Sequence, residues 1–136
     1  THSAAIYALV KSDVKGAAQR ANKIFREMDQ LAFVGVSKCE PITQTFDALI
    51  DVWGRSNEKN GAEQAESMFH EMMSRYKAGN KNVKPSIRSC NKVLHAWSQS
   101  ANKDAPEKAE LFFRYIESLR ESNDEVDIKP HIVTFN

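Results

Sequence analysis

Residues 41–53 read PITQTFDALIDVW, and residues 85–97 read PSIRSCNKVLHAW. Both stretches open on proline, close on tryptophan and space their apolar residues by three and four positions, which is typical of an amphipathic helix. The apolar positions recur at an interval of 44 residues. They hold Phe46, Leu49, Ile50 and Trp53, then Cys90, Val93, Leu94 and Trp97, and upstream His2, Ala5, Ile6 and Leu9.

A second apolar pattern recurs at the same interval of 44 residues. Its positions hold Ala18, Ala21, Ile24, Phe25 and Met28, then Ala62, Ala65, Met68, Phe69 and Met72, then Pro106, Ala109, Phe112, Phe113 and Ile116. Two stripes that recur together predict an all-α fold, an α-solenoid of antiparallel helix pairs. We expect helices over residues 3–13, 16–32, 43–56, 62–77, 87–101 and 105–121, and a seventh opening near Val133.

Prolines divide the chain into repeats, which we expect to form one domain over residues 1–136. Pro41, Pro85 and Pro130 each precede the first helix of a pair, where proline is tolerated and prevents continuation from upstream. The expected repeats cover about residues 1–41, 42–85 and 86–130, and a further repeat starts at 131–136. Both ends fall inside a repeat, so we interpret the chain as a fragment.

Composition indicates a soluble protein without membrane spans. Of the 136 residues, 41% are hydrophobic and 27% are charged, and the formal net charge of +1 argues against a strongly electrostatic nucleic-acid binder. No targeting peptide is visible, and the sequence has no phosphate loop, nucleophile motif or clustered metal ligands. We therefore expect no enzyme activity, cofactor, metal or small-molecule substrate.

The two cysteines and two tryptophans have structural interpretations. Cys90 and both tryptophans, Trp53 and Trp97, lie in the apolar stripe, so we expect them in the core rather than at a ligand. Cys39 falls in a connecting loop. The absence of paired cysteine spacing favours a reducing compartment.

Several segments resemble the pentatricopeptide repeat family. Residues 41–50, 85–91 and 130–136 are similar to its opening, Pro-Asp-Val-Val-Thr-Tyr-Asn. Residues 62–72 and 105–115 resemble its second-helix segment, Ala-Leu-Glu-Leu-Phe-Glu-Glu-Met. The repeats here are 44 or 45 residues long, whereas those of the family have roughly 35. The extra residues fall in polar turns, which predicts insertions on one face.

The resemblance implies a right-handed superhelix whose first helices bind single-stranded RNA, one base per repeat. It also implies a protein of a mitochondrion or plastid (chloroplast) that serves RNA processing, stability or translation. Base reading would fall to Ser3, Ile42, Asp47, Ser86, Asn91, His131 and Asn136. Base sandwiching would fall to Gln44, Arg88 and Val133. Phosphate contacts would fall to Lys11, Arg55 and Lys92. Asn suits base reading because its amide both donates and accepts hydrogen bonds.

Several of these assignments have alternatives. Asp47 and Asn91 also fit solvated positions at a helix start. The chain also fits a protein-binding scaffold, such as a subunit of an organellar ribonucleoprotein. The apolar segment LAFVGV, which begins at Leu31 and ends at Val36, is either a continued helix end packed on the next pair or a partner-docking patch.

Overall fold

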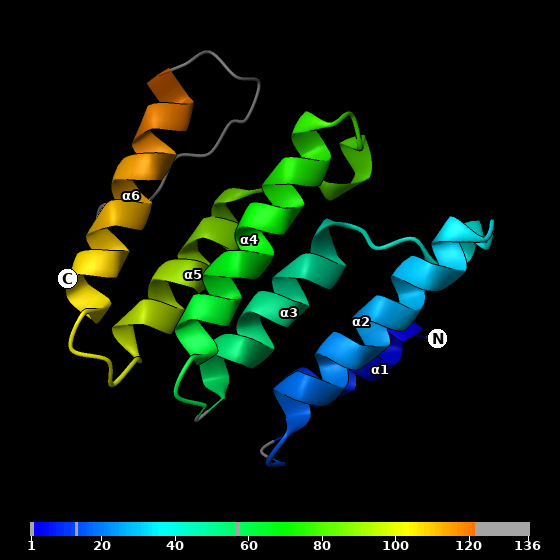
Figure 1. The fold of residues 1–136 in the computed structure, drawn as a ribbon, viewed down its shortest axis with the longest axis horizontal. Helices are drawn as coiled ribbons and strands as arrows, with labels where there is room; N and C mark the ends of the chain where they lie inside the picture. The colour runs from blue at the N-terminus through cyan, green and yellow to red at the C-terminus, as the bar shows by residue number, and fades with distance from the viewer. Residues whose placement is uncertain (1, 13, 57, 122–136) are drawn as a thin grey trace.

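The chain folds into helices throughout the part that the structure, a computed structural model, describes: residues 2–12, 14–56 and 58–121 (Figure 1). These ranges contain six α-helices, two short 3-10 helices and no strand. The α-helices are α1 (His2–Val10), α2 (Ala17–Phe33), α3 (Thr43–Arg55), α4 (Gly61–Lys77), α5 (Ile87–Ser98) and α6 (Ala105–Glu121). The 3-10 helices are η1 (Ser37–Cys39) and η2 (Lys81–Val83). Within these ranges, no helix is long and apolar enough to cross a membrane.

The predicted all-helical class is confirmed, and most helix bounds agree with the periodicity. The main differences are two early helix ends: α1 ends at Val10 rather than at residue 13, and α5 ends at Ser98 rather than at residue 101. In both cases a serine just beyond the helix bonds to the backbone. The Ser12 hydroxyl accepts from the Val14 amide, and the Ser100 hydroxyl accepts from the Asn102 amide, each at 3.2 Å. Such local bonds compete with helical ones.

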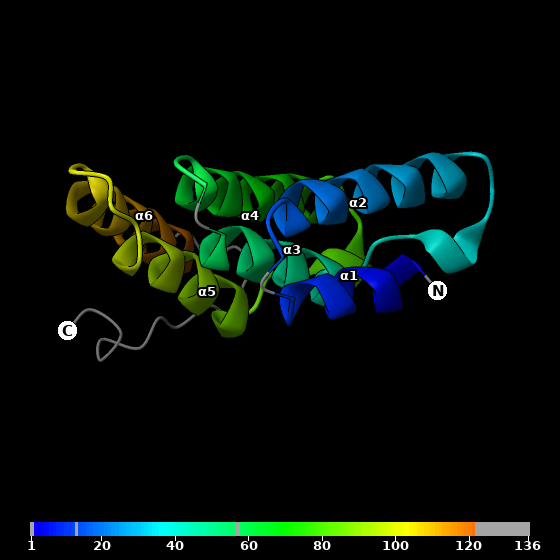
Figure 2. The ribbon, with the colours of Figure 1, turned by 90° about the horizontal axis from the view of Figure 1, so that it is seen from below.

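The six helices lie in two layers. Figure 2 shows α1, α3 and α5 in one layer and α2, α4 and α6 in the other. Each odd helix packs on the even helix that follows it, and contacts between α1 and α3 and between α3 and α5 join the pairs. The first stripe of the sequence therefore builds one layer and the second stripe builds the other.

A continuous apolar core runs between the layers. Phe25, Phe46 and Phe69 are fully buried, and Ala21 and Ala65 are buried where neighbouring helices approach. The rings of Phe25 and Phe46 meet edge to face, with centroids 5.1 Å apart. Edge-to-face contact is a preferred aromatic geometry, which suits phenylalanine at both positions.

The predicted core positions of the tryptophans and of Cys90 are confirmed. All three side chains are buried, and burial raises the pKa of the Cys90 thiol. Cys39 lies, as expected, in the connection between α2 and α3, where it ends η1 and is half-buried. The punctuating prolines Pro41 and Pro85 each lie two residues before a helix, at α3 and α5, as predicted. Pro130 lies outside the described residues.

The prediction that the apolar segment of residues 31–36 is a continued helix end packed on the next pair is only partly confirmed. Helix α2 does extend to Phe33, as expected. The expected packing on the next pair is wrong for Phe33 and Val34, which are 92% and 72% exposed. Phe33 still lies within α2, off the stripe that holds Phe25 and Met28, and the chain then turns at Gly35, whose φ of 102° suits glycine.

Candidate nucleic-acid interface

A shallow groove crosses the layer of odd-numbered helices. Its volume is about 750 Å³, and it draws its lining from three helices of different pairs. Because α1, α3 and α5 lie side by side in one layer (Figure 2), equivalent turns of three repeats face the same space. The lining residues, which define the groove below, are Tyr7, Val10, Lys11, Gln44, Asp47, Ala48, Asp51, Arg55, Ile87, Arg88, Asn91, Lys92 and His95.

Most of the candidate residues taken from the sequence come together in this groove. Of the ten that fall within the described residues, it gathers seven: Lys11, Gln44, Asp47, Arg55, Arg88, Asn91 and Lys92. They represent all three roles that the family resemblance implies. These residues converge because positions 44 residues apart are equivalent on successive odd helices and therefore face the same side of the layer.

The other candidates lie elsewhere. Ser3 is half-buried on α1, and Ile42 and Ser86 occupy the N-cap positions of α3 and α5. The Ser86 hydroxyl accepts from the Ser89 amide at 3.3 Å, so this side chain caps its helix. His131, Val133 and Asn136 lie outside the described residues.

Asp51 holds two of the predicted phosphate-binding cations. Its Oδ1 accepts from Arg55 Nε at 3.0 Å, and its Oδ2 accepts from Lys92 Nζ at 3.1 Å. Arg55 lies one turn along α3, whereas Lys92 reaches across from α5. The sequence did not mark Asp51 as a site residue, although its spacing of four from Arg55 is typical of a helical ion pair.

Asp47 is buried beneath the groove and bonded across two helices. It is 7% exposed, and the buried Ser89 hydroxyl of α5 donates to its Oδ1. Burial raises the pKa of Asp47, and the bond from Ser89 and the nearby charges of Lys92 and Arg88 only partly oppose that rise. The interpretation of Asp47 as a solvated helix-start residue is therefore wrong, because α5 covers it.

Asn91 occupies the position equivalent to Asp47 and has an unsatisfied atom. Its side-chain Oδ1 is buried and has no hydrogen-bond partner among the described residues. A buried acceptor in this state costs about 1–3 kcal/mol. Asn91 also lines the groove, so a ligand held there would lie beside an amide whose hydrogen-bonding capacity is not fully used within the described residues.

The remaining groove charges and rings are free to meet a ligand. Lys11 and Arg88 are exposed, and neither forms an ion pair or hydrogen bond within the described ranges. Tyr7 and His95 expose their rings in the same groove, at positions 44 residues before and after Asp51. Sequence reasoning missed both rings because they stand on the polar side of the helical stripe. The repeat interval was the signal that could have identified them.

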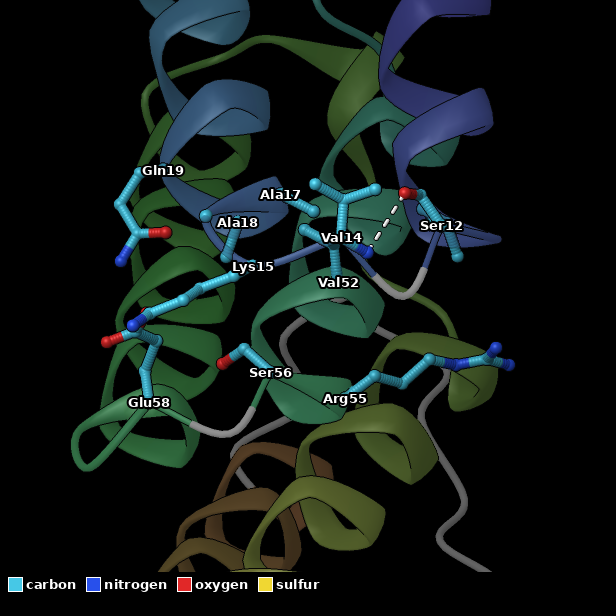
Figure 3. A pocket seen from close by; sticks show the side chains of 12 residues that line it. Ser12, Val14, Lys15, Ala17, Ala18, Gln19, Val52, Arg55, Ser56 and Glu58 are labelled. Atoms are coloured by element: carbon cyan, nitrogen blue, oxygen red, sulfur yellow. Dashed lines mark hydrogen bonds between the residues drawn. The ribbon is translucent and has the colours of Figure 1, made fainter.

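A second hollow, of about 510 Å³, lies where the α1–α2 connection meets the end of α3 (Figure 3). Its lining mixes small apolar side chains, such as Ala17 and Val52, with Lys15 and Glu58. Arg55 borders this hollow as well as the groove. No group of three or more side chains that could hold a metal ion occurs among the described residues, in this hollow or in the groove.

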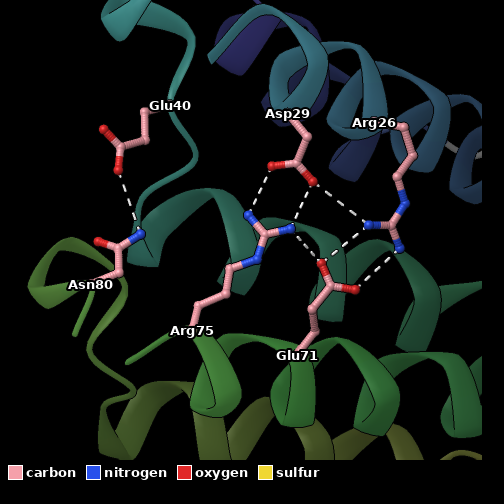
Figure 4. Close-up of polar contacts among 6 residues, drawn as sticks. All are labelled: Arg26, Asp29, Glu40, Glu71, Arg75 and Asn80. Atoms are coloured by element: carbon pink, nitrogen blue, oxygen red, sulfur yellow. Dashed lines mark hydrogen bonds and ion pairs between the residues drawn. The ribbon is translucent and has the colours of Figure 1, made fainter. Parts of the chain in front are cut away.

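The opposite layer is tied together by an ion-pair network between α2 and α4 (Figure 4). Arg75 donates two bonds to Asp29, at 2.8 and 2.6 Å, and one to Glu71 at 2.7 Å. Arg26 donates two further bonds to Glu71. The bonds to Asp29 raise the pKa of Arg75 despite its burial. The cations of this network are therefore bonded to carboxylates, whereas Lys11 and Arg88 form no ion pair within the described ranges.

Comparisons with known proteins add no relative. No family model matches the chain, and neither a curated protein nor a solved structure matches it. The resemblance to pentatricopeptide repeats therefore rests on the residues themselves and remains a proposal.

Proposed function

We propose that the chain forms a pentatricopeptide-type α-solenoid and binds single-stranded RNA along the groove. The observation that supports this most directly is the gathering of seven candidate residues in one space across three helices. In this proposal, the strand crosses α1, α3 and α5 in turn. The protein would act on organellar transcripts, in a mitochondrion or plastid, by marking or protecting a site.

The charge of the groove favours a polyanion. Its lining includes four cationic side chains, Lys11, Arg55, Arg88 and Lys92, and two carboxylates, Asp47 and Asp51. With both carboxylates ionised, the groove lining has a formal charge of +2, compared with +1 for the whole chain. Local rather than total charge determines attraction to a phosphate backbone.

The other groups of the groove favour unpaired bases. Tyr7 and His95 provide ring faces, which stack on bases of any sequence. The amide of Asn91 can hydrogen-bond to a base edge, and the guanidinium of Arg88 can stack on a base or contact a phosphate. Rings and amides reach bases only where the bases are not paired, so a single strand is the form that fits.

The test is binding of randomised single-stranded RNA, measured by fluorescence anisotropy at two salt concentrations, with single-stranded DNA as a control. We expect salt-sensitive binding that prefers RNA. The double variant Asn91→Ala with Arg88→Ala should weaken binding about tenfold or more and leave helicity unchanged. The matched control, Asn60→Ala with Arg114→Ala, removes an exposed amide and an exposed guanidinium outside the groove and should bind as the wild type. Equal weakening by both variants would contradict the groove assignment.

A protein-binding scaffold is the second candidate, and the exposure of Phe33 and Val34 favours it. Large apolar side chains this exposed are common at protein interfaces. If this is the function, Phe33→Ser should abolish retention of a co-purifying partner while Arg88→Ala leaves it intact. Substitution of Lys81, which begins η2 in the polar connection after α4, should then also matter more than any change in the groove.

A further inference from the structure

We propose that Asp51 is an intramolecular competitor for phosphate that limits the affinity of the groove for RNA. The inference rests on the proposed function and names the residue that regulates the same site. It starts from one contrast: two groove cations, Arg55 and Lys92, are bound to Asp51, and two others, Lys11 and Arg88, have no such partner among the described residues.

The geometry places one carboxylate between two cations. Arg55 Nε lies 3.0 Å from Oδ1 of Asp51, and Lys92 Nζ lies 3.1 Å from Oδ2. Both oxygens are therefore occupied, and both cations point at the same acid. A phosphate that approaches either cation must displace the carboxylate or share the cation with it, which reduces the gain from each contact.

Burial makes this competitor effective. The Asp51 side chain is 17% exposed, and that of Lys92 is 27% exposed, so water screens their interaction less than it screens a surface pair. The Arg55 side chain is 62% exposed, so it is the cation that an incoming phosphate reaches first. Release of Lys92 then requires a second exchange.

The repeat identifies Asp51 as an exception at its position. The equivalent position holds Tyr7 in the first pair and His95 in the third, and both line the groove without a carboxylate. The middle pair alone places an acid there. A side chain that carries no negative charge is therefore compatible with the fold at this position, and the substitution Asp51→Asn keeps its shape while it removes the charge.

The experiment compares Asp51→Asn with wild type and with a matched control, Glu110→Gln. Glu110 pairs with Arg114 on α6 at 2.8 Å, outside the groove, so the control also frees an arginine and adds the same charge. Binding of randomised single-stranded RNA is measured between about 50 mM and about 200 mM salt. Circular dichroism and thermal unfolding establish that each variant is folded.

We expect Asp51→Asn to bind about fivefold to tenfold more tightly than wild type at the lower salt, and Glu110→Gln to bind as wild type. Two freed cations should steepen the logarithmic salt dependence by about 1.4, from the coefficient of about 0.7 for each phosphate contact to a single strand. The gain should disappear when Arg55→Gln and Lys92→Gln are added to Asp51→Asn.

Two results would overturn the inference while leaving the proposed function intact. One is RNA binding by the wild type with no difference between Asp51→Asn and Glu110→Gln. The other is weaker binding by Asp51→Asn, which would make Asp51 a contact rather than a competitor. If neither the wild type nor Asp51→Asn binds RNA at the lower salt, the proposed function itself fails, and the inference fails with it.

Discussion

At the scale of single residues, equivalent positions of the repeat have taken on different electrostatic roles. Asp47 and Asn91 correspond in sequence, yet Asp47 is bonded to Ser89 and Asn91 leaves its Oδ1 without a partner among the described residues. The difference arises because α5 packs over Asp47 and supplies a hydroxyl there. A reading of the sequence alone assigns both the same role.

The raised pKa of Asp47 leads to a prediction about stability and pH. The folded chain holds this proton more tightly than the unfolded chain, so ionisation of Asp47 disfavours folding. Its contribution is neutral well below the ordinary value of 3.8, where both states are protonated, and becomes unfavourable as pH rises from that value to the raised folded-state value. Asp47→Asn keeps an acceptor for Ser89 and removes the charge. We expect it to raise the free energy of unfolding by about 1 kcal/mol near neutral pH.

Urea unfolding at neutral pH and near pH 3 checks this prediction, because the advantage of Asp47→Asn should vanish at the lower pH. Ser89→Ala serves as the control for loss of the hydrogen bond and should destabilise the chain. A loss of stability in Asp47→Asn at neutral pH would show that the charges of Lys92 and Arg88 outweigh burial.

At the scale of helices, successive pairs differ in whether the tryptophan of the odd helix finds a hydrogen-bond acceptor on the preceding even helix. Trp97 of α5 donates its indole proton to Glu66 of α4 at 2.9 Å. Burial opposes the charge on Glu66, yet the bonds from His70 and Trp97 outweigh it and lower the pKa of that carboxyl. In the preceding pair, the buried Trp53 indole nitrogen has no partner among the described residues. The position equivalent to Glu66 there is Asn22, whose side chain is one methylene shorter and does not bond to the indole.

Supplying a longer acceptor should stabilise the first interface. Asn22→Glu, by analogy with Glu66, should raise the free energy of unfolding by about 1 kcal/mol, the usual net worth of a hydrogen bond. Glu66→Ala should lower it by about 1–3 kcal/mol, because it leaves the Trp97 indole unsatisfied. Urea unfolding followed by tryptophan fluorescence measures both.

Asn22→Met is the matched control for that experiment. Methionine adds a chain of similar length without a strong acceptor, and its helix propensity is close to that of glutamate, so both variants gain equally from the loss of asparagine in the helix. Equal stabilisation by Asn22→Met and Asn22→Glu would mean that helix propensity or added apolar contact, and not the indole bond, explains the gain.

At the scale of the whole molecule, neighbouring helix pairs are joined through both layers. The first and second pairs are joined in the even layer by the network of Arg26, Asp29, Glu71 and Arg75 (Figure 4). Arg75 also lies over the rings of Phe25 and Phe46, with its guanidinium carbon 5.3 Å from each centroid. One side chain therefore connects two even helices and the core. Where each unit contacts only its neighbours, we expect the units to open locally.

Removal of that connection should loosen one end of the molecule. Arg75→Met keeps the aliphatic stem and leaves Asp29 with only Arg26, at 3.7 Å, among the described residues. We expect a loss of about 1–2 kcal/mol, between the values for surface and buried pairs. Hydrogen exchange should show faster exchange in α1 and α2 and little change in α5 and α6.

Arg114→Met, which breaks an exposed pair within α6, is the control and should leave exchange in α1 and α2 unchanged. A uniform loss of protection from α1 to α6 in Arg75→Met would mean that the chain opens as a single cooperative unit.

The amino-acid sequence by itself determined the helices, their order in pairs and most of the core. Helical periodicity is a local property, so the stripes that include Phe46, Trp53 and Phe69 mark the buried faces before any tertiary contact is known. Because the repeat interval is constant, candidate residues with the same expected role lie on the same face of the odd helices. That is why the groove gathers positions as distant in the chain as Lys11 and Arg88.

Tertiary structure alone decided which polar side chains are free. Asp51 binds Lys92, and Asp47 binds Ser89, because α3 and α5 approach closely. The local sequence pattern does not predict the distance between these two helices. The exposure of Phe33 was likewise visible only in the structure, since the sequence also allowed this segment to pack on the next pair. Helix formation depends on neighbours three and four residues away, whereas charge pairing and burial depend on helices about forty residues apart in the chain.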